Sequence, residues 1–290
     1  MWFVFAVAAA SCFGLRGILY HWTSQRPIDR NLLLLGVYLS GTFITLAGNL
    51  FVQQSWSTWA LFGILMGLFS FIANASMYKG YAVGKASIVA LFTGLPPLVV
   101  MIVAFVLWRE ELTAWQFTAF FIVLSGLILI KYSQDLKINQ LKGVQWGVLT
   151  MLFFGFTDVS VKQATLSGAG PLPVLTVMFA TGSVLFGISW AINKAKKAAS
   201  PNEAELPNNW TMKRTLGWGM IVGITNAAGM LLIFPAFRDG ITGIVSAIVA
   251  MNVAFVILYA RFYLKEHWNK REITGLSMAF VGILILRIAS

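Results

Sequence analysis

Apolar residues occur along the chain in long runs that are separated by short polar gaps. The run from Leu98 to Trp108, for example, holds eleven apolar residues before Arg109 and two glutamates follow. Most runs have about 18 to 23 residues, enough to span a hydrocarbon core as a helix, and they lack the alternation of membrane strands. The pattern predicts an all-α integral membrane protein with ten transmembrane helices. The predicted spans are residues 2–20, 32–52, 59–78, 86–107, 114–131, 144–161, 172–192, 215–237, 242–263 and 272–289.

Charge is scarce and unevenly distributed. Only 11% of residues are charged and 58% are hydrophobic, against roughly 25% charged in a soluble domain. The net charge of +11 is scattered over the gaps, which argues against a nucleic-acid partner. The gaps after the first, third, fifth, seventh and ninth spans share one side of the membrane and hold sixteen Lys and Arg residues. The other side holds four: Arg109, Lys162, Arg238 and Arg287. The positive-inside rule predicts that the first side is cytoplasmic and that both termini lie outside, in a multi-pass protein of the cell (inner) membrane.

The second half of the chain repeats the first. A shift of 156 residues aligns residues 63–131 with 219–287 without a gap, and it keeps a glycine pair and a turn of one basic residue and one glutamate in step. Phe13-Gly14 matches Phe154-Gly155 at a shift of 141. We therefore predict two five-helix repeats, at 1–135 and 136–290. Because five is odd, the second repeat should be inverted in the membrane, a construction that secondary transporters use to open one central site alternately to each side.

Several motifs resemble those of a known transporter family. They are Phe13-Gly14, the stretch "ASIVALFTGLPPLVVMIVAFVLWREELTAWQ" followed by "SGLILIK", and in the second half "IVSAIVAMNVAFVILYARFYLKEHW" and "VGILILR". With these motifs the chain resembles the drug/metabolite transporter superfamily, in its EamA-like ten-helix branch. The resemblance implies a secondary carrier of small metabolites or drugs, with export of amino acids or related metabolites by alternating access at a central cavity. The resemblance also implies that both termini are cytoplasmic, which is the opposite of what the charge bias predicts. It further implies a proline pair in each half, whereas this chain has Asn252-Val253 in the second half.

Polar residues inside the predicted spans are the candidates for substrate binding. Such groups are costly in a bilayer and tend to face the interior or water. The predicted substrate-binding residues are Arg16, Asn74, Tyr78, Thr93, Asp158, Asn226, Asn252 and Tyr259. For the asparagines, hydrogen bonds between helices are an alternative role.

Arg16 and Asp158 take nearly equivalent places in the two repeats. One hypothesis is that both face the cavity and pair in one state of a transport cycle. The alternative is that Arg16 extends to the headgroups while Asp158 pairs with Lys162, one turn further along the same helix.

Other residues suggest mechanical roles. Pro96 and Pro97 fall inside the predicted span 86–107, where we expect a bend that serves as a hinge or is only a structural kink. The pairs Gly63/Gly67 and Gly219/Gly223 predict close helix packing. Glu110 and Glu266, each beside a basic residue at the end of a span, are expected to anchor loops or act as gates.

Motifs for other chemistry fail. "GYAVGKAS" at Gly80 lacks the spacing of a phosphate-binding loop, His21 and His267 have no zinc-ligand spacing, and Cys12 stands alone. We therefore predict no enzyme activity, catalytic residue, metal or cofactor. The expected partners are a small-molecule substrate, the lipid bilayer, and a proton or an exchange substrate, for a monomer or homodimer. A membrane channel and an intramembrane enzyme stay open as alternatives.

Overall fold

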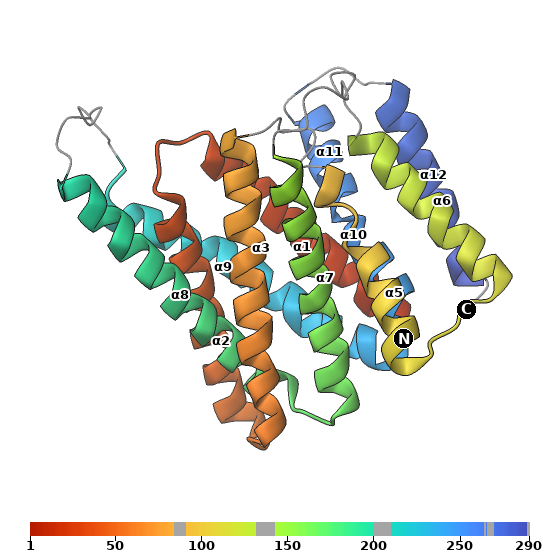
Figure 1. The fold of residues 1–290 in the computed structure, drawn as a ribbon, viewed down its shortest axis with the longest axis horizontal. Coiled ribbons are helices and arrows are strands. Elements are labelled where there is room, and N and C mark those ends of the chain that lie inside the picture. The colour runs from red at the N-terminus through yellow and green to blue at the C-terminus, as the bar shows by residue number, and fades with distance from the viewer. Residues whose placement is uncertain (84–90, 132–142, 200–209, 264, 266–269, 289–290) are drawn as a thin grey trace.

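Long helices run back and forth between the two ends of the molecule (Figure 1). The computed structural model describes residues 1–83, 91–131, 143–199, 210–263, 265 and 270–288. No strand occurs in these ranges, which confirms the all-α prediction. The elements are α1 (Trp2–Ser24), α2 (Arg30–Val52), the 3₁₀ turn η1 (Thr58–Leu61), α3 (Phe62–Val83), α5 (Pro96–Trp108), α6 (Ala114–Lys131), α7 (Val144–Leu166), α8 (Pro171–Ala199), α9 (Met212–Asp239), α10 (Thr242–Ala250), α11 (Asn252–Phe262) and α12 (Lys270–Ile288).

The lengths of the helices fit a membrane protein. Seven helical stretches within the described residues are long and apolar enough to cross a bilayer, whereas α5 and α6 are apolar but shorter. The chain is therefore a multi-pass membrane protein. The count of ten spans stays a prediction.

Two of the predicted spans are interrupted, and at equivalent positions of the repeat. In the first half the chain turns at residues 93–95 before α5 begins, and in the second half Met251 separates α10 from α11. Leu95 and Met251 lie 156 residues apart, which is the shift that aligns the two halves. Both halves therefore build a broken helix, although only one of them has a proline pair at the break.

The chain is interrupted at Pro96 and Pro97, where a bend was expected, by a turn before α5. A role as a hinge stays a prediction for both prolines. They are the first two residues of α5. Proline is well accommodated there because the first N–H groups of a helix have no acceptor within it, and because its fixed φ suits the first turn. The start of the predicted span, residues 86–90, lies outside the described residues.

A left-handed residue follows each of the helices after the two breaks, directly after α5 and three residues after the end of α11. α5 ends at Arg109, a non-glycine residue with a left-handed φ of 54°, and Lys265, its equivalent at the shift of 156, has a φ of 57°. A left-handed residue stops a helix and turns the chain sharply. The turn that the sequence repeats is thus repeated in backbone geometry, while Glu266 itself lies outside the described residues.

The most extensive helix contacts of each half have equivalents in the other half. α1 packs on α9 as α7 packs on α3, and α1 contacts α11 as α7 contacts α5. α2 packs on both α8 and α9, and α3 on α8, while α6 and α12 form a pair at one edge of the molecule (Figure 1). The core therefore lies where the two halves meet, and each half supplies equivalent walls to it.

Glycines allow the closest of these crossings. A side chain on Gly63 or Gly67 would overlap the backbone of α8, and one on Gly219 or Gly223 would overlap the backbone of α2. Small residues one helical turn apart let helix backbones approach in a membrane, where packing drives association. The predicted packing role of both glycine pairs is confirmed.

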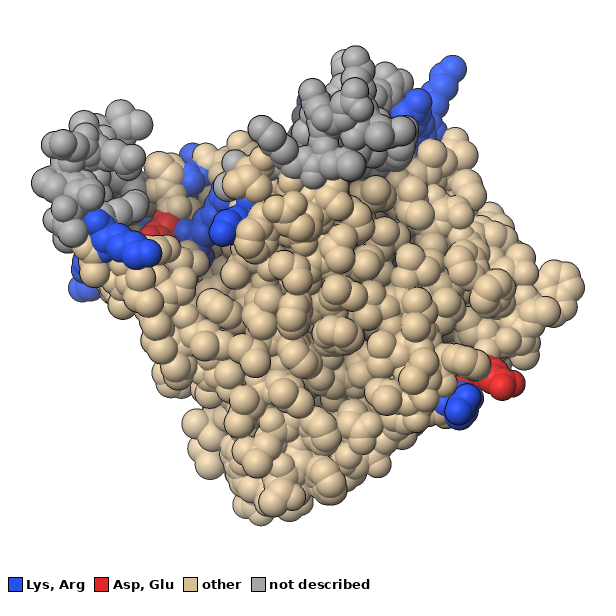
Figure 2. Space-filling view, in the orientation of Figure 1, with Lys and Arg blue, Asp and Glu red and all other residues tan. Residues whose placement is uncertain are grey.

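Basic side chains gather at one end of the molecule. In Figure 2 they follow the upper edge, the end at which α8 finishes and α9 begins, while the opposite edge shows few charges. By sequence Lys162 belongs to the opposite side, but it is only 6% exposed and lies inside α7, where it binds protein groups. Among the described residues, exposed basic side chains are therefore concentrated at the end where α8 finishes and α9 begins. The membrane orientation stays a prediction.

Candidate functional site

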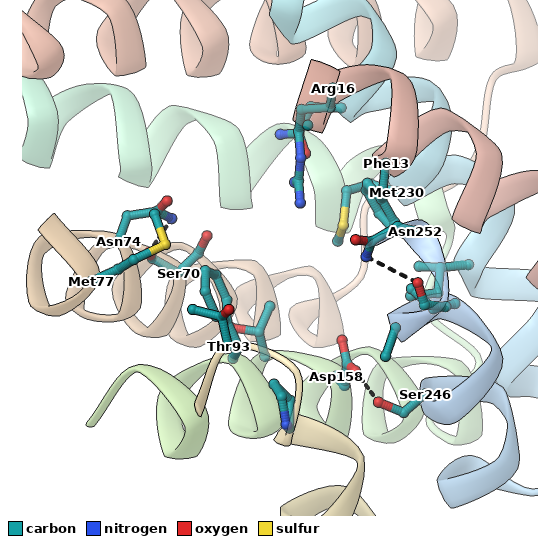
Figure 3. Close-up of a pocket in the computed structure, with 18 of the residues that line it drawn as sticks. Phe13, Arg16, Ser70, Asn74, Met77, Thr93, Asp158, Met230, Ser246 and Asn252 are labelled. Carbon is teal, nitrogen blue, oxygen red and sulfur yellow. Dashed lines mark hydrogen bonds between the residues drawn. The ribbon is translucent and has the colours of Figure 1, made fainter. Parts of the chain in front are cut away.

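A central cavity of about 250 Å³ lies between the two halves (Figure 3). On α1, Phe13, Arg16, Gly17 and Tyr20 line it, and this spacing places them on one face of the helix. The cavity is slightly smaller than the range of about 300–1,000 Å³ that is common for ligand pockets, so it suits a small metabolite.

The other walls come from equivalent positions of the repeat. α3 and α9 each contribute three lining residues at the same helical spacing, and the two sets differ by 156 in number. These are Ser70, Asn74 and Met77 on α3, and Asn226, Met230 and Ile233 on α9.

Arg16 carries the positive charge of the cavity. Its Nη1 donates a 2.5 Å hydrogen bond to Oδ1 of Asn226, and its guanidinium lies 4.6 Å from the ring centre of Phe13. The bond to Asn226 uses one of five N–H donors, so others can meet an anionic group. Asn226 and the aromatic ring hold the guanidinium toward the cavity rather than toward the headgroups.

Asp158 carries the negative charge. It lies on α7, and its Oδ2 accepts a 2.7 Å hydrogen bond from the hydroxyl of Ser246 on α10. Figure 3 shows Asp158 and Arg16 on opposite sides of the same open space. An acid and a base thus face one cavity from different helices.

Neither hypothesis for these two residues describes this conformation fully. Arg16 binds Asn226 and Asp158 binds Ser246, so they are not paired with each other here. The alternative is wrong about Lys162, whose partner is Glu110 at 3.1 Å, and about Arg16, which lines the cavity. A pairing of Arg16 with Asp158 in another state stays a prediction.

The remaining candidates divide into two groups. Asn74, Thr93 and Asn252 line the cavity, as do both prolines of α5. The amides of Asn74 and Asn252 donate to backbone carbonyls of their own segments, at 2.7 and 3.0 Å. Tyr78 and Tyr259 are not among the cavity's lining residues: Tyr78 lies beneath Arg30, and Tyr259 stacks on Tyr263.

Sequence reasoning missed several lining residues. Ser246 and Ser70 are short hydroxyl side chains that are common in membrane helices for packing, so their type alone does not mark a site. The repeat could have found one of them, since a shift of 156 takes Asn226 to Ser70. No such shift marks Ser246, because its equivalent is Ala90.

A second cavity of about 810 Å³, which we call the vestibule, adjoins the first. It is lined by the turn between α1 and α2 and by the ends of α3 and α8, including Arg26, Arg30 and Lys194. Tyr20 and Met77 belong to the walls of both cavities. The central cavity therefore lies next to the vestibule at the basic end of the molecule.

The sequence matches the model of the EamA-like transporter family at residues 1–132 and again at 141–288. The chain belongs to the EamA-like transporter family. Membership makes it a membrane transporter of the drug/metabolite type, and the double match agrees with the two repeats seen in its packing. No curated protein sequence matches this EamA-like transporter.

A solved structure, titled "Crystal structure of protein", has the same fold. It covers 100% of this EamA-like transporter and 99% of its own chain, with a TM-score of 0.79 and 11% sequence identity. At that identity the likeness concerns the fold alone. The substrate has to be argued from the cavity of the EamA-like transporter itself.

Proposed function

We propose that this EamA-like transporter is a secondary carrier of small zwitterionic metabolites, with amino acids or close relatives as the substrate class. The observation that carries the proposal is the pair of opposite charges, Arg16 and Asp158, that face one cavity from different helices. A carboxylate suits the guanidinium, which binds it with parallel hydrogen bonds, and an ammonium group suits the aspartate.

The rest of the cavity suits a largely apolar side chain. Phe13, Phe154, Met178 and Met230 contribute rings and thioethers to its wall. Thioethers are adaptable and polarisable, and aromatic rings offer large apolar surfaces. A substrate would be held at its charged ends, while its side chain contacts these residues.

Alternating access is part of the proposal. Two halves with equivalent packing can exchange their arrangements, so that a site between them opens first to one end and then to the other. The vestibule supports access from the basic end in this conformation. A membrane channel is the second candidate function, and it differs in needing a path that is open to both ends at once.

Counterflow in proteoliposomes tests the proposal. Vesicles preloaded with an unlabelled amino acid should take up labelled amino acid faster and to a transient excess over equilibrium, and neutral sugars, nucleosides and lipophilic cations should not compete. Runs with and without a pH gradient separate proton coupling from exchange. If preloading does not change the uptake of labelled amino acid, a channel is favoured. If neutral or purely cationic solutes compete for uptake, the proposal of a zwitterionic substrate is refuted.

A further inference from the structure

A cluster of charged and polar groups joins the two halves at the end opposite the vestibule. We call it the Glu110 cluster: the side chains of Glu110, Lys162 and Thr242 with the carbonyls of Phe237 and Gly240. The vestibule lies at the C-terminal end of α1, whereas Gly240 lies beside Trp2 at its first turn. A helix of this length separates its ends by about 35 Å. The Glu110 cluster and the vestibule therefore belong to opposite ends of the molecule.

Glu110 reaches across from the first half to the start of α10. One carboxylate oxygen accepts from the backbone N–H of Thr242 at 2.7 Å, and the other accepts from its hydroxyl at 2.8 Å. The sharp turn at Arg109 ends α5 immediately before Glu110. A carboxylate at a helix N-terminus satisfies a backbone donor and is favoured by the helix dipole. Glu110 thus caps a helix that belongs to the other half.

Lys162 completes the cluster from α7. Its ammonium lies 3.1 Å from Glu110 and donates to the carbonyls of Phe237, at 2.8 Å, and of Gly240, at 3.2 Å. The carbonyls belong to the last turn of α9 and the residue after it, where orphan acceptors accumulate. Because Lys162 is 6% exposed, its charge depends on these partners in place of water.

The cluster lies one helical turn beyond the central cavity. On α7, Asp158 faces the cavity and Lys162 follows it by four residues; on α10, Thr242 precedes Ser246 by four. The two helices are therefore bridged twice, by Asp158 and Ser246 at the cavity and by Lys162, Glu110 and Thr242 beyond it. A group that binds Asp158 from the cavity would compete for the first bridge, next to the second.

We propose that the Glu110 cluster is the gate that closes the central cavity at the end opposite the vestibule, and that it opens when Glu110 leaves Thr242 and Lys162. This inference rests on the proposed carrier function and adds the residues that regulate its site. A polar gate is suited to repeated opening, because water can solvate the separated carboxylate and ammonium and so offset the broken ion pair and hydrogen bonds. Apolar side chains in the same place would gain no such solvation free energy when water reached them.

Cysteine accessibility tests the gate without any substrate. Ala250 lines the cavity, so Ala250→Cys in a Cys12→Ala chain reports access when an impermeant thiol reagent is added to either face of oriented vesicles. In this parent chain we expect labelling through the vestibule and little from the gated end. Glu110→Gln should raise the rate from the gated end about tenfold, which corresponds to about 1.4 kcal/mol of lost closure, and Thr242→Val should raise it less.

A matched control lies at the same end. Arg238 and Asp239 form an ion pair whose side chains are 66% and 43% exposed, so Arg238→Gln removes a charge there without touching the cavity and should leave labelling unchanged. Rates are compared for variants whose vestibule-side labelling equals that of the parent, which shows that the cavity has folded. The gate is overturned if Glu110→Gln and Thr242→Val both label from the gated end as slowly as the parent. It is also overturned if Arg238→Gln raises this labelling rate as much as Glu110→Gln does. In both cases the carrier proposal stands. Equal labelling from both faces of the parent would also overturn the gate, whereas the counterflow experiment decides the carrier proposal.

Discussion

Replacing Arg16 with glutamine should weaken the binding of a zwitterion far more than that of its carboxamide analogue. Glutamine keeps a long polar side chain that can still donate to Asn226, which is only 4% exposed and would otherwise be left with an unsatisfied amide oxygen. The substitution therefore removes the positive charge and the guanidinium donors while keeping the internal hydrogen bond. Methionine would instead add a cost of about 1–3 kcal/mol in stability, by burying the amide unpaired.

The size of the effect follows from the charged hydrogen bonds that the substitution removes. A hydrogen bond to a charged group contributes about 1.5–3 kcal/mol, and each 1.4 kcal/mol is a factor of about ten in affinity. We expect Arg16→Gln to raise the dissociation constant of an amino acid about 10- to 150-fold. The amino-acid amide has no carboxylate, so its affinity should be unchanged or improved by the loss of a neighbouring positive charge.

Asp158→Asn provides the mirror variant. It should weaken the zwitterion strongly and the N-acetyl analogue, which has no ammonium group, little. Half-saturation in counterflow and ligand-induced thermal stabilisation of purified protein give the four affinities of each cycle. If Arg16→Gln weakened amino acid and amide by the same factor, Arg16 would be a packing residue and the assignment of its charge to a carboxylate would be refuted.

Three further predictions concern packing, mechanics and orientation. Gly219→Ala should lower the thermal midpoint of unfolding by several degrees, because overpacking against α2 costs about 1–3 kcal/mol. Gly217→Ala is the control and should not lower it, since a Cβ added at Gly217 meets no atom within 4 Å. Equal midpoints for the two variants would contradict the packing role. Replacing both prolines at the start of α5 with alanine should extend helix into the break and reduce turnover more than folded yield, and a parallel loss would leave the break structural. In a chain without its native cysteine, single cysteines in place of Lys196 and Ser55 should react with an impermeant thiol reagent from opposite faces of the membrane. Position 196 should be protected in intact cells. Labelling of position 196 from outside would reverse the predicted orientation.

The hydrophobic pattern sufficed to predict helices and their approximate bounds, because membrane length and apolarity are local properties of the sequence. The repeat sufficed to predict that glycines in equivalent helices serve equivalent crossings. The break in the second half was not predictable in this way. Met251 and Asn252 carry no signal as strong as a proline pair, so the sequence alone did not mark this interruption.

The site was predictable where the cost of burial is high. Arg16, Asp158 and Asn226 were expected because charges and amides are rarely placed in a bilayer without a partner or a cavity, and all three line the cavity. Tyr78 and Tyr259 do not line the central cavity, although Tyr78 lines the vestibule, so a role of either tyrosine in substrate binding stays a prediction. The sequence analysis also gave Glu110 and Lys162 separate roles. Nothing in the local sequence indicates that Glu110, in the turn after α5, contacts both Lys162 on α7 and Thr242 on α10.

The unlike residues at equivalent cavity positions have an evolutionary consequence. The glycines that set the helix crossings are identical in the two halves, whereas cavity positions differ: Arg16 corresponds to Thr157, and Asp158 to Gly17, at the shift of 141. After a duplication, one copy can thus acquire a charge while the other keeps a small or neutral residue, with no change in the shared scaffold. Selection can therefore retune what such a protein carries by single substitutions in one half, and chains that share this architecture can diverge in substrate well before they diverge in shape.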